Sequence, residues 1–145
     1  MNVDPSTGEV REPAEVELVP LNLASLNEQE LFQMFPSPVQ CAGALLIARR
    51  TLAEAPAILA ARSKALKDAK RNLISARGYA YQKAEGRDAA TRRLVAESNA
   101  DVIAAWEAID TCELALEYAR ERRKSLSEDI DILRSLNANF RGEHS

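Results

Sequence analysis

Apolar residues recur every seven positions on both sides of Gly86, and this repeat constrains the fold more than any other feature of the chain. Before Gly86 the repeat consists of Leu45, Leu52, Leu59, Leu66, Leu73 and Ala80. After it come two rows, Val102, Ile109, Leu116, Arg123, Ile130 and Asn137, and Ala105, Cys112, Ala119, Leu126, Leu133 and Phe140. Apolar residues at positions a and d of a heptad pack one helix along another. The pattern predicts an all-α fold, a long coiled-coil-like antiparallel helical hairpin over residues 37–140.

Local signals set the limits of the two arms, which we expect at about residues 38–85 and 88–139. Ser37 is a typical N-cap, followed by a proline at the first helical position. Pro56 interrupts the first arm, but the leucine repeat keeps its register across it, which favours a kink over a loop. We expect Gly86 to take a left-handed conformation at the turn and Asp88 to cap the second arm.

Charge favours the antiparallel pairing of the arms. Residues 57–93 hold ten bases and three acids, whereas residues 94–121 hold seven acids and one base. Facing helices of opposite sign stabilise one register and penalise slipped ones. With a turn near residue 87, residues whose numbers sum to about 174 should lie at the same level of the two arms.

The N-terminal region differs in composition from the hairpin. Residues 1–40 hold seven acids and one base, and the prolines and glycine within residues 1–24 favour a disordered acidic tail. Ser25 and Glu28 have the spacing of a capping box, so we expect a short amphipathic helix within residues 25–36. We expect residues 141–145 to fray.

A cluster of cations should form a basic band where the two arms meet. Its members are Arg49, Arg50, Arg120, Arg122, Arg123 and Lys124. Arg123 occupies an a position, where an apolar residue would pack better, so it either controls register or faces an anionic partner. The band is therefore either a solvated, partly paired face or a contact for phosphate or an acidic partner.

A second patch, near the turn, combines bases with aromatic residues: Arg77, Tyr79, Tyr81 and Lys83. Aromatic side chains between bases stack on single-stranded nucleic acid, although tyrosine near a hairpin turn also serves packing. A third set comprises apolar candidates for a protein interface, Leu26, Leu31, Phe32, Phe35, Trp106, Leu133 and Phe140. Two helices leave much apolar surface open, so we expect a homodimer.

The sequence offers no constellation that would support catalysis or bind a cofactor or a metal ion. The only histidine, His144, lies in the segment that we expect to fray, and no nucleophile has a plausible base beside it. Metal-ligand spacings and glycine-rich phosphate loops are absent. Cys41 and Cys112 are too far apart along the predicted arms to pair. No apolar run reaches the length of a membrane span, and no signal peptide precedes the acidic start. We expect a non-enzymatic cytoplasmic protein with no small-molecule substrate and no membrane contact.

Two short motifs resemble a family of small helical-hairpin accessory proteins of tailed double-stranded DNA phages. Asp4-Pro5-Ser6-Thr7-Gly8-Glu9-Val10 is similar to the start of phage recombination and replication accessory proteins. The stretch Lys83-Ala84-Glu85-Gly86-Arg87-Asp88-Ala89-Ala90-Thr91-Arg92-Arg93 is similar to the turn of such hairpins, although Thr91 stands where they have an acid. The resemblance implies a phage or prophage protein that acts near DNA recombination in the bacterial host cell.

Two functions are consistent with these features. In the first, the chain is a helical interaction module that self-associates or binds a phage or host protein through its apolar edge, in a nucleic-acid context. In the second, it contacts single-stranded or duplex DNA directly through the basic band, and the acidic tail restrains or competes for that site.

Overall fold

A computed structural model describes residues 2–3, 10–11 and 17–143, and the fold of the chain is all-α, as predicted. The elements, in chain order, are strands β1 (Asn2–Val3) and β2 (Val10–Arg11), a 3₁₀ helix at Leu23–Ser25, and helices α1 (Glu28–Met34), α2 (Pro38–Ala53), α3 (Ala55–Lys83), α4 (Ala89–Glu97) and α5 (Ala100–Glu143). The two strands pair antiparallel, with Val3 opposite Val10.

The chain divides into two compact units, and the boundaries lie within α3 and α5. Unit 1 comprises Met1–Leu59 and Tyr118–Ser145, and unit 2 comprises Ala60–Glu117. The heptad repeat supplies core residues to both units, so each unit has its own apolar core. The predicted hairpin of residues 37–140 therefore contributes to two separate bodies.

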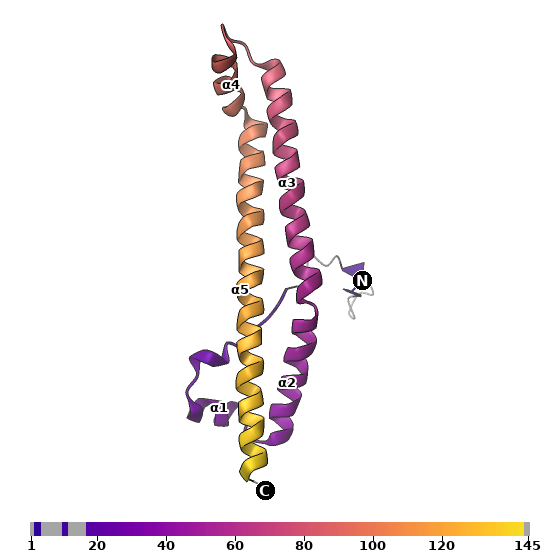
Figure 1. Cartoon of the computed structure of the whole chain (residues 1–145), viewed down its shortest axis with the longest axis vertical. Coiled ribbons are helices and arrows are strands. Elements are labelled where there is room, and N and C mark those ends of the chain that lie inside the picture. Colours follow the sequence, from indigo (N-terminus) through magenta and orange to yellow (C-terminus); the bar gives the residue numbers. More distant parts are fainter. Residues whose placement is uncertain (1, 4–9, 12–16, 144–145) are drawn as a thin grey trace. The chain divides into compact units, whose positions relative to one another are not determined.

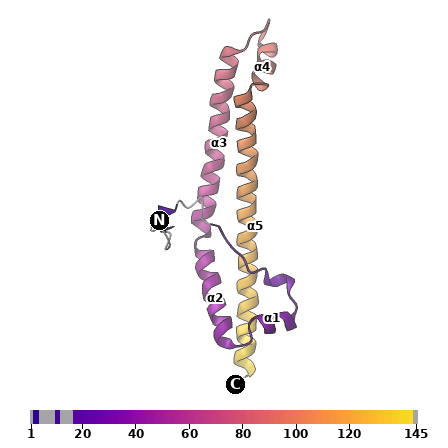
Figure 2. The ribbon, with the colours of Figure 1, turned by 180° about the vertical axis from the view of Figure 1, so that it is seen from behind.

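In unit 1, α1 and α2 both lie beside the C-terminal part of α5 (Figures 1 and 2). The first core cluster contains Leu23, Phe35, Cys41, Leu45, Ala48, Ile130, Leu133, Leu136 and Phe140. Phe32 on α1 packs edge-on against Phe140, with 6.1 Å between ring centroids. A second cluster contains Leu18, Ala55, Ile58, Ala119 and Leu126. Burial of these side chains is the main force that holds the helices together.

An extended segment before the 3₁₀ helix is fixed to α5 by a buried carboxylate. Asp129 is only 1% exposed, and its two oxygens accept hydrogen bonds from the backbone N–H groups of Leu21 (2.7 Å) and Leu23 (2.8 Å). The side chains of Leu18 and Leu23, from the same segment, are buried. We call residues 17–23 the strap. The predicted disorder of residues 1–24 is therefore wrong for the strap, whereas residues 1, 4–9 and 12–16 of the tail lie outside the described residues.

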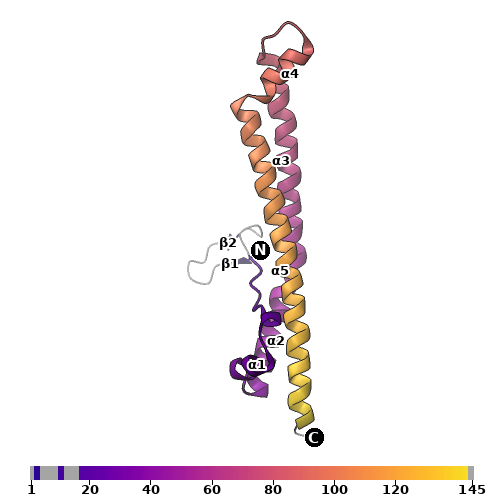
Figure 3. The same cartoon turned by 90° about the vertical axis from the view of Figure 1, so that its left-hand side faces the viewer.

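In unit 2, the C-terminal part of α3 packs antiparallel to the first turns of α5, and α4 lies beside the end of α3 (Figures 1 and 3). Its core contains Ala69, Leu73, Ala80, Ala96, Val102 and Ile109. The small side chains of the alanines in this core permit close approach of the helices.

Hydrogen bonds within each unit agree with the predicted register. The Cys41 thiol donates to the carbonyl oxygen of Leu133 at 3.4 Å in unit 1, and Arg77 Nε donates to Glu97 Oε1 at 2.7 Å in unit 2. The residue numbers of both pairs sum to 174. The prediction that such pairs lie at the same level is confirmed for both contacts.

Two predicted caps are present and one is displaced. The Ser37 hydroxyl accepts from Gln40 N, and the Asp88 carboxylate accepts from Thr91 N at 2.7 Å, as expected. However, α1 is capped by Asn27, which accepts from Glu30 N, whereas Ser25 ends the 3₁₀ helix. The capping-box prediction was wrong because the amide of Asn27 is nearer to the helix start and serves the same acceptor role.

Three sites along the arms and their turn differ in detail from the predicted conformation. At Pro56 only Glu54 separates α2 from α3, and Glu54 keeps right-handed helical dihedral angles, so no loop forms. The second arm is broken after Glu97, where Asn99 accepts from Asp101 N and starts α5, a break that we did not predict. Gly86 does not have a left-handed φ; instead, a Cβ there would lie only 3.0 Å from Cγ2 of Thr91. The glycine is therefore needed because the Thr91 side chain approaches it closely, and not because its φ is positive.

Candidate functional site

Part of the predicted basic band lines an open groove in unit 1. The groove has a volume of about 680 Å³, and its lining residues are Leu52, Ala55, Pro56, Arg120, Glu121, Arg123, Lys124 and Ser127. Three cations and one carboxylate therefore surround an apolar floor. The Arg123 side chain is exposed, although its heptad position would usually be buried. It is therefore available to an anionic partner, which favours partner contact over register control as its role.

Arg122 has a different role from the one we predicted. One guanidinium nitrogen donates to the carbonyl oxygen of Leu18 at 2.6 Å and lies 3.5 Å from Glu17, and another donates to the Tyr118 hydroxyl. Its charge also lies over the Tyr118 ring, 4.3 Å from the centroid. These contacts hold the strap on α5, so Arg122 serves folding and is removed from the predicted anion contact.

Arg49 and Arg50 are exposed on α2 but do not line this groove. The structure therefore brings together only three of the six predicted cations in the groove: Arg120, Arg123 and Lys124. None of the three takes part in an ion pair among the described residues.

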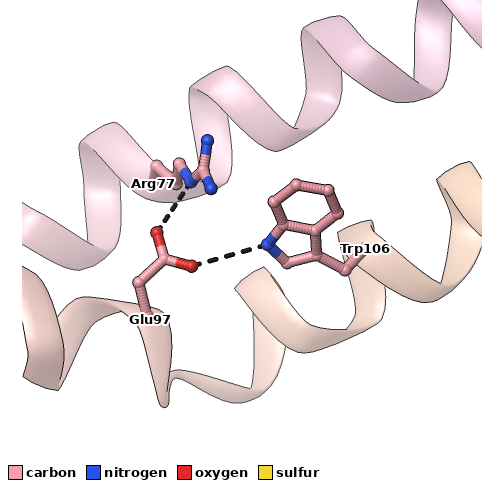
Figure 4. Close-up of polar contacts among 3 residues, drawn as sticks. All are labelled: Arg77, Glu97 and Trp106. Carbon is pink, nitrogen blue, oxygen red and sulfur yellow. Dashed lines mark hydrogen bonds and ion pairs between the residues drawn. The ribbon is translucent and has the colours of Figure 1, made fainter.

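One member of the second predicted patch, Arg77, contacts Trp106 of the predicted interface set in unit 2 (Figure 4). Glu97, the last residue of α4, accepts from Arg77 Nε at 2.7 Å and from Trp106 Nε1 at 3.4 Å. The Arg77 guanidinium lies 4.9 Å from the centre of the Trp106 ring. Trp106 stays 42% exposed despite these contacts. We call Arg77, Glu97 and Trp106 the Trp106 cluster.

Two residues of this cluster each lie one position after a residue of the heptad repeat. Trp106 follows the seam residue Ala105, and Arg77 follows the seam residue Ala76, so both side chains lie at the edge of the same interface. The break after α4 then brings the carboxylate of Glu97 between them. Sequence reasoning identified Arg77 and Trp106 but missed Glu97, whose only signal was the polar Ser98-Asn99 pair that ends the helix.

A shallow hollow of about 390 Å³ adjoins the Trp106 cluster. Its lining residues are Arg77, Gly78, Tyr81, Arg93, Ala96 and Glu97. Arg92 lies over the Tyr81 ring at 5.8 Å, so the aromatic face is already occupied by a cation from the chain itself. Tyr79 is 68% exposed, and Lys83 is exposed at the end of α3.

Most of the predicted interface residues belong to the core of unit 1. Leu133, Phe35 and Phe140 are buried, which corrects the prediction that they contact a partner. Leu31 and Phe32 are half-buried and line a groove of about 310 Å³ with Ile132 and Leu136 of α5, and Leu26 packs against the same core. Trp106 is the most exposed member of the predicted set.

The two thiols and the acidic side chains offer no metal site among the described residues, where no group of three potential ligands forms. Cys41 is buried, and burial raises the pKa of its thiol. Cys112 is half-buried beside the core of unit 2. His144 lies outside the described residues.

In the described part of the chain, no single helix is long and apolar enough to cross a membrane, although Glu28–Met34 and Pro38–Lys83, bent by 93°, together meet the criterion of length and composition. Comparison with known protein families, characterised proteins and solved structures finds no match.

Proposed function

We propose that this chain is a non-enzymatic helical interaction module of a phage or prophage, which acts in the bacterial cytoplasm by binding a protein partner through unit 2. The observation that carries this proposal is the exposed Trp106 cluster. Tryptophan, tyrosine and arginine are the residues that contribute most binding energy at protein interfaces. Here they lie together on a helical surface.

The geometry of the cluster favours binding, and so does its composition. Glu97 accepts hydrogen bonds from both Arg77 and Trp106, which restricts their side chains in the free chain. A partner would therefore lose less conformational entropy on binding than it would at a mobile tryptophan. Ile103, one turn before Trp106, is also exposed and extends the apolar contact area.

The phage context has a separate basis. It depends on the two motifs that resemble phage accessory proteins, at Asp4–Val10 and Lys83–Arg93. The second motif contains the turn in which Asp88 caps α4. The motifs support a setting in nucleic-acid metabolism, whereas the Trp106 cluster supports the act of binding.

Photocrosslinking tests this function. A photoreactive amino acid is placed at position 103 of the full chain, and a control chain carries it at position 128, where Glu128 is exposed in unit 1. We expect a protein adduct from position 103 that disappears when Trp106→Ala is added. Equal adducts from both positions, or none from position 103, would contradict the proposal.

Direct DNA contact is a second candidate, because Arg120, Arg123 and Lys124 line one groove and are free of ion pairs among the described residues. Replacement of all three by alanine should abolish binding of a labelled single-stranded oligonucleotide in fluorescence anisotropy. Three phosphate contacts predict a log–log salt slope of about −2. The control replaces Lys64, Lys67 and Lys70 of unit 2, which removes the same charge. An equal loss in both variants would indicate nonspecific attraction only.

The acidic tail enters this second candidate because it continues into Glu17, which lies 3.5 Å from Arg122 in the same unit as the groove. Residues 1–16 contain four acids and one base. If the tail competes with DNA, its removal before Glu17 should tighten oligonucleotide binding and leave thermal stability unchanged. Unaltered affinity after this truncation would exclude competition.

A further inference from the structure

The surface around the Trp106 cluster is a continuous stripe of exposed side chains on both helices of unit 2. On α3, Ile74 and Tyr81 lie one turn on either side of Arg77, and on α5, Ile103 lies one turn from Trp106. The contact between Arg77 and Trp106 sets the two stripes side by side. Ile74 is 70% exposed and adds apolar area to this stripe.

Along the same two stripes, unpaired charges of opposite sign follow the apolar residues. Lys67 and Lys70 precede Ile74 on α3 at helical spacing, and Asp110 and Glu113 follow Trp106 on α5. All four are exposed, and none takes part in an ion pair among the described residues. One helix thus presents a basic edge and the other an acidic edge on one face, which we call the docking face.

A two-fold axis parallel to the helices would match this face with itself. Such an operation places α3 of one copy opposite α5 of the other, and the reverse. The lysine edge of each copy then meets the acidic edge of its partner, and the isoleucines and Trp106 lie between them. The four helices would form a bundle with a shared apolar core.

Gly78 leaves open space at this face, as Gly43 does on α2. It lies within α3 and lines the hollow beside the Trp106 cluster, and apart from its chain neighbours and the backbone of its own helical turn no atom lies within 4 Å of the position that a Cβ would take. Glycine weakens a helix interior relative to alanine, and no contact within unit 2 compensates for that cost here. A side chain from outside can enter the notch that Gly78 leaves.

We propose that a second copy of this chain binds at the docking face of unit 2, with two-fold symmetry, its charged edges paired crosswise and an apolar side chain seated at Gly78. This inference rests on the proposed interaction function and identifies its partner.

Sedimentation equilibrium of the full chain with Gly78→Ala tests the notch, and Gly43→Ala is the matched control. Gly43 lies in α2 of unit 1 and likewise has no atom within 4 Å of its Cβ position apart from its chain neighbours and its own helical turn, so both substitutions should stabilise their helices equally. We expect Gly78→Ala to weaken dimerisation by at least about tenfold and Gly43→Ala to leave it unchanged. Equal dimerisation constants for the two variants would overturn the proposal.

Charge exchange tests the crosswise pairing. Lys70→Glu and Glu113→Lys should each weaken the dimer, because each places like charges opposite one another, and the double variant should restore it. Trp106 is the only tryptophan, so its emission and its quenching by acrylamide report directly on burial at the face. A blue shift with rising protein concentration is expected for the wild-type chain.

The failure of this inference can be separated from failure of the proposed function. A wild-type chain that stays monomeric at all concentrations, while position 103 still crosslinks to a different protein, would overturn self-docking and leave the interaction function intact. A dimer that ignores Gly78→Ala and both charge variants would also overturn it, because the copies would then meet elsewhere.

Discussion

The carboxylate of Asp129 accepts a hydrogen bond from the backbone N–H of Leu23 at 2.8 Å, across 106 residues of sequence. Its other oxygen accepts from Leu21, so a single side chain satisfies two backbone donors of the strap. A buried carboxylate is stable only when such donors surround it. This contact joins the N-terminal strap to the core of unit 1, and it explains why an acid occupies a buried position on α5.

Replacing Asp129 with alanine should destabilise unit 1 strongly. Two N–H groups would lose their acceptor, which costs on the order of 2–4 kcal/mol of the free energy of unfolding. Urea denaturation followed by circular dichroism measures the change. Asp131→Ala is the control, since Asp131 is exposed two residues further along α5, and it should change stability little. Equal effects of the two substitutions would show that the buried contact adds no more to the free energy of unfolding than an exposed aspartate does.

The strap also depends on Asn22, which lies between the two donors with a left-handed φ of 57°. That conformation turns both neighbouring N–H groups toward Asp129. Asn22→Gly should therefore be tolerated, whereas Asn22→Val should lower stability by about 1–2 kcal/mol because a β-branched residue resists this conformation. Thermal melts of both variants test this ranking of stability. A valine variant as stable as the glycine variant would contradict it.

Asp88 predicts a pH dependence in unit 2. The hydrogen bond from the backbone N–H of Thr91 lowers the pKa of the Asp88 carboxyl, because the bond favours the charged form. The cap therefore stabilises α4 at pH values above the ordinary aspartate pKa, and this stability is lost as the pH falls through the lowered pKa. Asp88→Asn keeps an acceptor but cannot titrate, so its melting temperature should fall less steeply below pH 5 than that of the wild type. An unchanged slope in Asp88→Asn would contradict this role of the cap.

Much of the helical core could be predicted from the sequence, since a heptad repeat fixes which face of a helix is buried. Val102, Ile109 and Leu133 lie in cores where the repeat placed them. The break after Glu97 was missed because apolar periodicity does not report single lost hydrogen bonds. Asp129 was missed because periodicity treats an acid beside the seam as solvated, although here it contacts backbone donors that are distant in sequence.

The candidate sites were only partly predictable for the same reason. Charge clustering placed Arg120, Arg123 and Lys124 together, but it could not show that Arg122 binds the carbonyl oxygen of Leu18. Likewise, Leu133 was expected at an interface because two helices leave apolar surface open. The strap and α1 cover that surface in unit 1, and neither has a heptad pattern that would have indicated it.

The two cysteines make it possible to test whether the units open independently. Cys41 is buried in unit 1, where its raised pKa keeps the thiol neutral and unreactive, whereas Cys112 lies at the edge of the core of unit 2. Leu133→Ala should destabilise unit 1 by about 2–5 kcal/mol and accelerate alkylation of Cys41, with little effect on Cys112. Ile109→Ala, in the core of unit 2, should do the reverse. Mass spectrometry of peptides after timed alkylation gives both rates in one sample. If either substitution accelerates both cysteines equally, the units unfold as a single cooperative body, and the division of the chain into two stability units is wrong.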